Sequence, residues 1–433
     1  MALRRKKVYS PQNSHTFRQQ AIAWAHQFNH VHLFSNNAYQ YPFGGFANML
    51  AAGCAEICPM EPYNTFASLQ QFHDASKDWL IGYFTYDLKN EIEDLQSRNQ
   101  DYLQFPSAYF YVPRHIIHFT ETAISIETLE NPEDVYEQIV SQTLTDPKSL
   151  TRSAIEVKQR TTSATYMAHV ESIKNHILEG DVYELNYCME FFAENALLNP
   201  WPVYEALNKK SPMPFSVYGR IQDFYLMCAS PERFLKKTGN QLLSQPIKGT
   251  ARRGNSPEED EKIRIALRHN EKELAENMMI VDLVRNDLAK SAVTGSIKVE
   301  EIFGIYTFPQ LHQMISSVSA TKRPDLPFTE AIRNAFPMGS MTGAPKIKAM
   351  ELIDQYEQAY RGLYSGAVGY ITPNADFDFN VVIRSILYNA KNKYLSFQAG
   401  SAITYDALAL QEYKECLLKA RAMHDVLQTA GEM

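Results

Sequence analysis

Strand-like segments occur in runs along this chain, and long helical segments separate the runs. Alternating, aromatic-rich patterns with polar turns predict strands in the first 150 residues and again toward the end of the chain, at 79–86, 107–112, 116–129, 366–372, 378–388 and 393–398. Strand and helix do not alternate strictly, as a parallel sheet would require. We therefore predict an α+β fold in which antiparallel sheets pack as a sandwich with flanking helices.

Helical periodicity marks the segments between the strands. Apolar residues recur at helical spacing from Tyr166 to Ile177, and Gly180 follows as a stop signal. The other expected helices lie at 131–140, 258–288, 345–356 and 408–427.

A length of 433 residues favours more than one unit. The polar stretch 145–153, which contains Pro147, is expected to connect two parts of the chain. We divide the chain into an N-terminal region, 1–150, and a catalytic region, 151–433. The N-terminal region is expected to complete the same body.

Composition excludes several classes of protein. A net charge of −7 without a dense Lys/Arg stripe argues against a nucleic-acid partner. No apolar run is long enough for a membrane segment. The five cysteines are scattered, which favours reduced thiols and a cytoplasmic location. Cys54 and Cys58 form a lone CxxxC, too few ligands for a structural zinc site.

Two expected helices each carry a pair of glutamates three residues apart. Glu273 and Glu276 form the first pair, and Glu412 and Glu415 form the second. Either pair alone is compatible with a solvated helix surface. If the pairs converge, they could bind Mg²⁺, which prefers oxygen ligands.

Single residues near apolar segments are further candidates, each with a structural alternative. Glu232 follows a strand pattern and could keep its proton as a general acid, or pair with Arg233. Lys248 precedes a glycine, where backbone approaches a ligand closely, and could act as a nucleophile or lie in a surface turn. His312 borders an apolar run, where structural histidines are common.

Three segments could bind an anion. The glycine-rich segment 339–346 enters a helix and could offer backbone N–H groups, although its spacing is not that of a Walker A motif. Arg384, expected in mid-strand, either pairs internally or binds an anionic substrate. The segment 398–402 is expected to be a loop that offers backbone donors beside the last helix.

Taken together, these segments resemble the chorismate-binding enzymes, a family that includes anthranilate, aminodeoxychorismate, isochorismate and salicylate synthases. The resemblance covers about residues 160–425 and rests on motifs in the family's order: GDVYELN, SPERF, PIKGT, KELAEN with MIVDLVRNDL, GSMTGAPK and EYKE. It implies the anthranilate synthase component I-like fold, with the site in a central cleft.

The resemblance also implies roles for individual residues. Mg²⁺ would be bound by Glu276 and Glu415, with Glu273 and Glu412 acting at longer range. The implied catalytic residues are Lys248, Glu232 and His312. The implied substrate-binding residues are Arg384, Lys419, Tyr364, Thr250, Gly249 and Gly400.

Lys248 distinguishes the branches of the family. Anthranilate synthases resemble this chain but carry Ala at this position, whereas PIKGT is the form of aminodeoxychorismate synthases. The implied reaction replaces the hydroxyl at ring carbon 4 of chorismate with an amine through a covalent lysine intermediate, toward p-aminobenzoate and folate. No cysteine lies in a G-x-C-x-G turn, so ammonia is expected from a separate glutamine amidotransferase subunit.

Two positions depart from the family pattern. Glu184 stands where Gln is expected, and Ala402 replaces the second glycine of AGxG. The water-adding relatives carry Lys at the position of Glu184, which argues against isochorismate or salicylate synthase. An anthranilate synthase large subunit and a non-catalytic chorismate-binding subunit remain alternatives.

Overall fold

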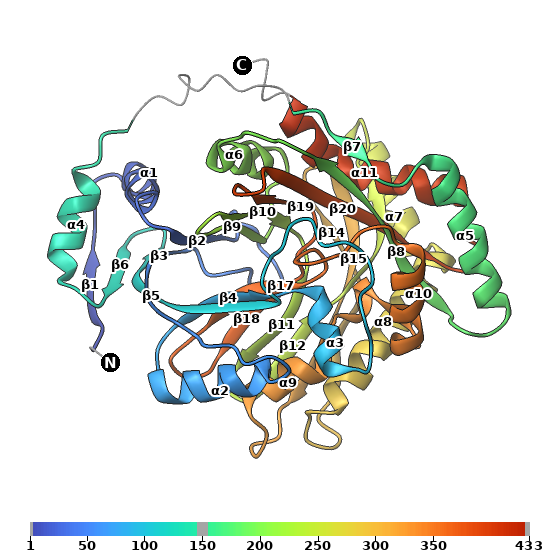
Figure 1. Ribbon diagram of the computed structural model, residues 1–433, viewed down its shortest axis with the longest axis horizontal. Helices are drawn as coiled ribbons and strands as arrows, with labels where there is room; N and C mark the ends of the chain where they lie inside the picture. The colour runs from blue at the N-terminus through green and yellow to red at the C-terminus, as the bar shows by residue number, and fades with distance from the viewer. Residues whose placement is uncertain (1–2, 145–154, 429–433) are drawn as a thin grey trace.

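The computed structural model describes residues 3–144 and 155–428 (Figure 1). All of the strand pairings described are antiparallel, and they join into one folded-over sheet. The joint is β5 (Ala108–Phe119), which pairs with β3 along one edge and with β4 and β6 along the other. Two limbs extend from β5 and face each other, so the predicted sandwich is made by a single continuous sheet.

The β4 limb is the series of strands that begins at β4. From β5 outward it runs through β4 (Leu80–Phe84), β17 (Ala367–Ile371), β18 (Phe377–Asn380), β11 (Arg233–Thr238), β12 (Gln241–Gln245) and β15 (Leu311–Thr321), and β15 also pairs with β13 (Ile247–Arg252) and β14 (Lys298–Thr307).

The β3 limb is the series that begins at β3. It runs through β3 (Met49–Ile57), β2 (His30–Ser35), β9 (Phe215–Ile221), β10 (Phe224–Ser230), β19 (Ser385–Asn389), β20 (Tyr394–Ile403) and β8 (Glu184–Ala193), whose outer edge pairs with β7 (Lys158–Gln159) and β16 (Gly343–Ala344). A side branch of β6 (Ile124–Thr128) and β1 (Arg5–Tyr9) extends from β5.

Helices lie around the two limbs (Figure 1). Those beside the β4 limb include α8 (Glu271–Ala289), α7 (Pro257–Arg268), α2 (Thr65–Ser76) and α9 (Phe328–Ala335), and those beside β8 and β20 include α11 (Ala409–Gln428), α5 (Ser163–Leu178) and α10 (Lys346–Tyr356). The others are α1 (Ser14–Ala25), α3 (Lys89–Ile92), α4 (Pro132–Val140), α6 (Pro200–Lys210) and the short 3-10 turns η1 (Tyr86–Leu88) and η3 (Gly339–Met341). No helix among the described residues is long and apolar enough to cross a membrane.

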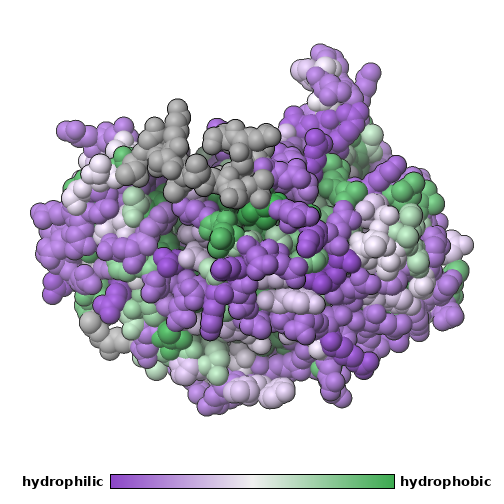
Figure 2. All heavy atoms as spheres, turned by 45° about the horizontal axis from the view of Figure 1, so that its top comes forward, coloured by the Kyte–Doolittle hydropathy of each residue, from purple (hydrophilic) through white to green (hydrophobic). Residues whose placement is uncertain are grey.

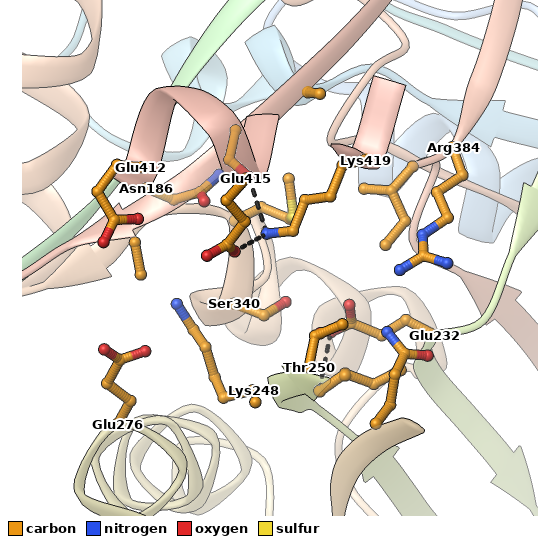
Figure 3. Close-up of a pocket in the computed structure, with 18 of the residues that line it drawn as sticks. Asn186, Glu232, Lys248, Thr250, Glu276, Ser340, Arg384, Glu412, Glu415 and Lys419 are labelled. Atoms are coloured by element: carbon orange, nitrogen blue, oxygen red, sulfur yellow. Dashed lines mark hydrogen bonds and ion pairs between the residues drawn. The ribbon is translucent and has the colours of Figure 1, made fainter. Parts of the chain in front are cut away.

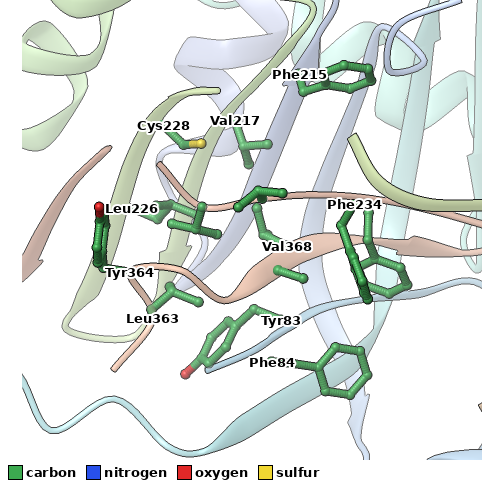
Figure 4. Close-up of a cluster of buried hydrophobic side chains, with 14 of the residues drawn as sticks. Tyr83, Phe84, Phe215, Val217, Leu226, Cys228, Phe234, Leu363, Tyr364 and Val368 are labelled. Atoms are coloured by element: carbon green, nitrogen blue, oxygen red, sulfur yellow. The ribbon is translucent and has the colours of Figure 1, made fainter. Parts of the chain in front are cut away.

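The core lies between the limbs. Val217 and Leu226 from the β3 limb share one buried cluster with Phe84, Phe234 and Val368 from the β4 limb (Figure 4). Hydrophilic residues cover most of the face in Figure 2, as expected when the apolar side chains are packed inside. Truncating one buried Phe typically costs about 3–5 kcal/mol, so this interlimb contact is a main source of stability.

Three sequence-based expectations about local structure are wrong. The helix predicted at 258–288 is two helices, because Asn270 caps the second by accepting a hydrogen bond from the Glu273 N–H. The strand predicted at 378–388 breaks after Asn380, and Arg384 has φ +51°. The segment 398–402, predicted as a loop, belongs to β20.

The ladders β2–β9 and β4–β17 join residues of the predicted N-terminal region to residues of the catalytic region. The predicted connection at 145–153 and the boundary at residue 150 both lie outside the described residues. The division into 1–150 and 151–433 therefore stays a prediction.

Candidate active site

A polar cavity of about 120 Å³ opens between the limbs, bordered by α8 and α11 (Figure 3). Twelve of the thirteen predicted site residues line it: Glu232, Lys248, Gly249, Thr250, Glu273, Glu276, Tyr364, Arg384, Gly400, Glu412, Glu415 and Lys419. The predicted residues come from strands, chain crossings and two helices, and folding brings them together.

Two chain segments cross from one limb to the other, and each places one charged side chain at the cavity. Glu232 lies between β10 and β11, and Arg384 lies between β18 and β19. The crossings hydrogen-bond to each other, since the Val381 N–H donates to the Glu232 carbonyl (3.0 Å) and the Ala229 N–H donates to the Arg384 carbonyl (3.2 Å). Glu232 and Arg384 are therefore held on a paired backbone support.

Glu232 has the environment of a proton donor. Its side chain is buried, and its Oε1 accepts a long hydrogen bond from the Ile247 N–H (3.5 Å). Burial raises the pKa of Glu232 to about 7. A carboxyl group with this pKa keeps its proton for a large part of the time at neutral pH. The alternative pairing with Arg233 is excluded, because Arg233 pairs with Asp378.

Arg384 is a cation available for an anion. Burial lowers its pKa to about 10, so the guanidinium remains charged at neutral pH. Within the part of the chain that the structure describes, no carboxylate lies within 4.0 Å of it. Of the two alternatives for Arg384, this geometry favours the binding of an anionic ligand.

Strand β13 presents Lys248, Gly249 and Thr250 to the cavity. Gly249 has φ +99°, a conformation that disfavours any side chain, and a Cβ there would lie 3.1 Å from Glu273 Oε2. The Asn277 side chain donates a hydrogen bond to the Lys248 carbonyl (3.1 Å). These contacts fix the backbone that carries Lys248.

The Lys248 amine forms a buried ion pair with Glu184 on β8. Lys248 is 8% exposed and Glu184 is 4% exposed. Burial alone would lower the pKa of Lys248, but the carboxylates of Glu184 and Glu276 outweigh it and raise the pKa above its ordinary value. Lys248 is thus a cavity residue and not part of a surface turn.

The two glutamate pairs do converge on the cavity, from α8 and α11. Lys272 Nζ lies 3.6 Å from Glu276 Oε1 and 3.5 Å from Glu412 Oε1. Lys419 Nζ lies 2.7 Å from Glu415 Oε1, and this ammonium lowers the pKa of Glu415.

The other acids at this end of the cavity hold protons more tightly than usual. Burial raises the pKa of Glu276 to about 7, and burial also raises those of Glu273 and Glu412. Glu276 Oε1 is buried and makes no hydrogen bond to any described residue. A carboxylate oxygen that accepts no hydrogen bond and lies among other carboxylates is suited to a divalent cation, although Lys272 now forms an ion pair with it.

His312 is placed differently from the other candidates. It is buried on β15 outside the residues that line the cavity. Its Nε2 lies 2.9 Å from Asp260 Oδ1, and its Nδ1 lies 2.9 Å from Thr307 Oγ1. Both ring nitrogens are thus engaged, and a catalytic role for His312 stays a prediction.

Tyr364 and Gly400 form part of the cavity wall. Tyr364 is buried with its hydroxyl 3.5 Å from Cys188 Sγ. The Gly400 carbonyl accepts a hydrogen bond from Lys419 Nζ (2.9 Å). A Cβ at Gly400 would overlap Cys188 Sγ and lie 2.6 Å from the Tyr187 carbonyl oxygen, so the strand needs a glycine here.

Sequence reasoning missed several polar residues of the cavity: Asn186, Lys272, Gln313, Ser340 and Gln398. Asn186, Lys272 and Ser340 belong to the recognised motifs GDVYELN, KELAEN and GSMTGAPK. The motifs therefore marked these positions, but they did not show that the side chains point into the cavity. The glycine-rich segment does not hold its lysine toward the cavity, because Lys346 Nζ lies 2.6 Å from Asp287 Oδ2.

A second cavity of about 310 Å³ adjoins the first. The two share Thr250, Arg384, Glu415, Lys419 and Met423, and the second is bordered further by apolar side chains of α6, β15 and α11. It extends the charged site along α6, β15 and α11.

This fold and this charged cavity define the class of protein. Residues 29–425 match the family model described as chorismate binding enzyme, and the chain belongs to this family.

Two of the similar proteins are named aminodeoxychorismate synthases. Aminodeoxychorismate synthase component 1 of Bacillus subtilis (strain 168) is 32% identical over 368 residues, or 81% of this chain and 77% of that protein. The probable chloroplastic aminodeoxychorismate synthase of Oryza sativa subsp. japonica is 39% identical over 270 residues, or 62% of this chain. That match spans only 30% of the rice protein.

A solved structure supports the fold. The anthranilate synthase component I of Streptococcus pneumoniae TIGR4 superposes with a TM-score of 0.76 at 25% identity, covering 87% of this chain and 91% of that one. The predicted α+β fold of the anthranilate synthase component I type is confirmed.

Proposed function

We propose that this protein aminates chorismate at ring carbon 4 to give 4-amino-4-deoxychorismate. The observation that carries the proposal is the Lys248 amine, which faces the cavity between Glu232 and the glutamates of α8 and α11 (Figure 3). The relatives named aminodeoxychorismate synthase support the same reaction.

Chorismate carries two carboxylates, and the cavity has a cationic group suited to each end. Arg384 is free of ion pairs with the described residues and would bind one carboxylate, with Lys419 and Thr250 beside it. Glu276 and Glu415 would hold a Mg²⁺ ion, with Glu273 and Glu412 at longer range. When bound, the ion would neutralise the local acids and fix the ring carboxylate.

The two reacting side chains would then act at different ring carbons. Glu232 gives its proton to the hydroxyl on carbon 4, which leaves as water, while the Lys248 amine bonds to carbon 2. Ammonia adds at carbon 4 and expels Lys248, so the new amine occupies the place of the hydroxyl. Two displacements divide one difficult step into two easier ones.

The ammonia would come from a glutamine amidotransferase subunit. A glutaminase of the common type needs a reactive cysteine, and burial raises the pKa of all five thiols here, Cys54, Cys58, Cys188, Cys228 and Cys416. These buried or half-buried thiols are poor nucleophiles. We also propose that the protein acts in folate biosynthesis and lies in the cytoplasm. The five free cysteines support the cytoplasmic location, because thiols stay reduced there.

Product analysis tests the proposed function. The protein is incubated with chorismate and Mg²⁺, with and without ammonium, and the products are identified by mass spectrometry. We expect 4-amino-4-deoxychorismate only when ammonium is present. Anthranilate as the main product, isochorismate or salicylate without ammonium, or no consumption of chorismate would each overturn the proposal.

A further inference from the structure

Glu184 has no role in the reaction as described above, yet it contacts the reactive amine. It is the first residue of β8, and the ladder between β8 and β16 holds its backbone opposite Ala344. Among the residues that the structure describes, Lys248 is the one side chain that donates a hydrogen bond to the Glu184 carboxylate. The Glu184 carboxylate is therefore oriented toward the Lys248 amine.

The surroundings of Lys248 keep its amine protonated. Glu184 on β8 contacts the amine. The carboxyl groups of Glu276 and Glu273 on α8, of Glu415 on α11 and of Glu232 on the crossing before β11 interact with its charge without a direct contact, and Lys419 on α11 is a nearby cation. The acids dominate this set. An ammonium has no lone pair, so Lys248 must lose a proton before it can bond to carbon.

We propose that Glu184 is the positioning residue of Lys248, which holds the amine at the cavity and takes up its proton when the amine attacks the substrate. This inference rests on the proposed function. The ion pair both positions the amine and provides a proton acceptor, because the Glu184 carboxylate is already in contact with the Lys248 ammonium.

The proton balance closes over one turnover. The Lys248 ammonium gives a proton to the Glu184 carboxylate, and the neutral amine forms a bond to carbon 2 while the carbon 4 hydroxyl leaves as water with the proton of Glu232. Ammonia then bonds to carbon 4, and the bond between carbon 2 and nitrogen breaks with its electron pair on Lys248. Lys248 recovers its proton from Glu184, and the Glu232 carboxylate takes one from the new ammonium group.

The residue type is essential to this role. Gln, which the family motif leads one to expect at position 184, is the same size and could hold the amine by its carbonyl oxygen, but it cannot accept a proton. Glu184 therefore gives this chain a proton acceptor that the expected residue would not supply.

The test compares Glu184→Gln and Glu184→Asp with the parent at saturating ammonium and Mg²⁺. In the parent, the proton moves within the ion pair, whereas in Glu184→Gln it must leave to solvent. We expect Glu184→Gln to lower kcat about a hundredfold near neutral pH, with KM for chorismate changed less than about threefold. The ratio of parent to variant kcat should fall about tenfold per pH unit between about pH 6 and about pH 8, and Glu184→Asp should recover part of the rate.

Both proteins contain Glu232, so its ionisation affects both rates in the same way and cancels in the ratio of their kcat values. Glu190→Gln is the matched control, because Glu190 is also a buried glutamate of β8 in an ion pair, with Arg160, and it lies outside the cavity. Its kcat ratio to the parent should not change with pH.

Two results would overturn the inference. One is a Glu184→Gln protein with the parent's kcat, and the other is a loss of rate that is the same at every pH. The proposed function would fail differently, by absence of the aminated product from the parent protein itself.

Discussion

Glu232 and Arg384 lie on adjacent crossings between the two limbs of the sheet, and the backbones of these crossings hydrogen-bond to each other. This arrangement fixes the proposed proton donor relative to the proposed anion site. It also leaves Arg384 with φ +51°, at the point where the chain turns from β18 into β19. The spacing of acid and cation thus depends on how the limbs are joined.

Replacing Lys248 with Ala should stop amination at carbon 4. We expect kcat to fall on the order of a hundredfold or more, because the covalent step is lost. Intact-protein mass spectrometry with chorismate but without ammonium should show an adduct on the parent and none on the variant. Lys346→Ala is the control, since Lys346 is a half-buried lysine paired with Asp287 outside the cavity. Equal rates in parent and Lys248→Ala would remove Lys248 from the chemistry.

The pH dependence of kcat should report Glu232. Burial raises the pKa of Glu232 to about 7, and the group must be protonated to act as an acid. The rate of the parent should therefore fall as the pH rises through about 7. Glu232→Gln cannot donate this proton and should lose about 10²- to 10⁴-fold in kcat. If the variant keeps the parent's rate and its alkaline decline, another group is the acid.

Glu276→Gln should weaken the dependence on Mg²⁺. The change removes a charged oxygen that has no hydrogen-bond partner among the described residues. We expect the Mg²⁺ concentration for half-maximal activity to rise about tenfold or more. Glu271→Gln, an exposed position in the first turn of the same helix, should leave this concentration unchanged. Superimposable magnesium titrations for parent and Glu276→Gln would show that the ligand assignment is wrong.

Gly400→Ala should destabilise the protein by crowding. The added Cβ would overlap Cys188 Sγ and press on the Tyr187 carbonyl, at a cost of about 1–3 kcal/mol in the free energy of unfolding. Urea denaturation measures this cost. Gly180→Ala is a useful contrast, because Gly180 has φ +84° and open space around it. Only backbone strain acts there, about 1 kcal/mol. A Gly400→Ala protein as stable as the parent would show that β8 and β20 can separate slightly.

The motifs predicted much of the cavity because each contains its functional residue within a short stretch of chain. PIKGT, KELAEN and EYKE supplied Lys248, Glu276 and Glu415, and the structure brings all three to one cavity. Contacts between distant segments were not predictable in the same way. Glu184 stood out only as a departure from a motif, and its pairing with Lys248 depends on how β8 approaches β13.

Local structure was predicted least well where one side chain outweighs a regular pattern. The Asn270 cap divides a helix whose apolar periodicity continues past it. The positive φ of Arg384 interrupts a segment that has a strand composition. His312 is a case in which the motif alone was insufficient. Its position in the family pattern does not reveal that Asp260 and Thr307 contact both of its ring nitrogens.

The buried pairing of Lys248 with Glu184 has a consequence for the durability of the protein. Taking both charges out of water is expensive, and two well-packed apolar side chains of similar volume are often neutral or more stabilising. Selection for heat resistance alone would therefore tend to erase this pair. We expect replacement of both Lys248 and Glu184 by apolar residues to raise the thermal stability of the protein and abolish its activity, so that stability and turnover are in conflict at this pair.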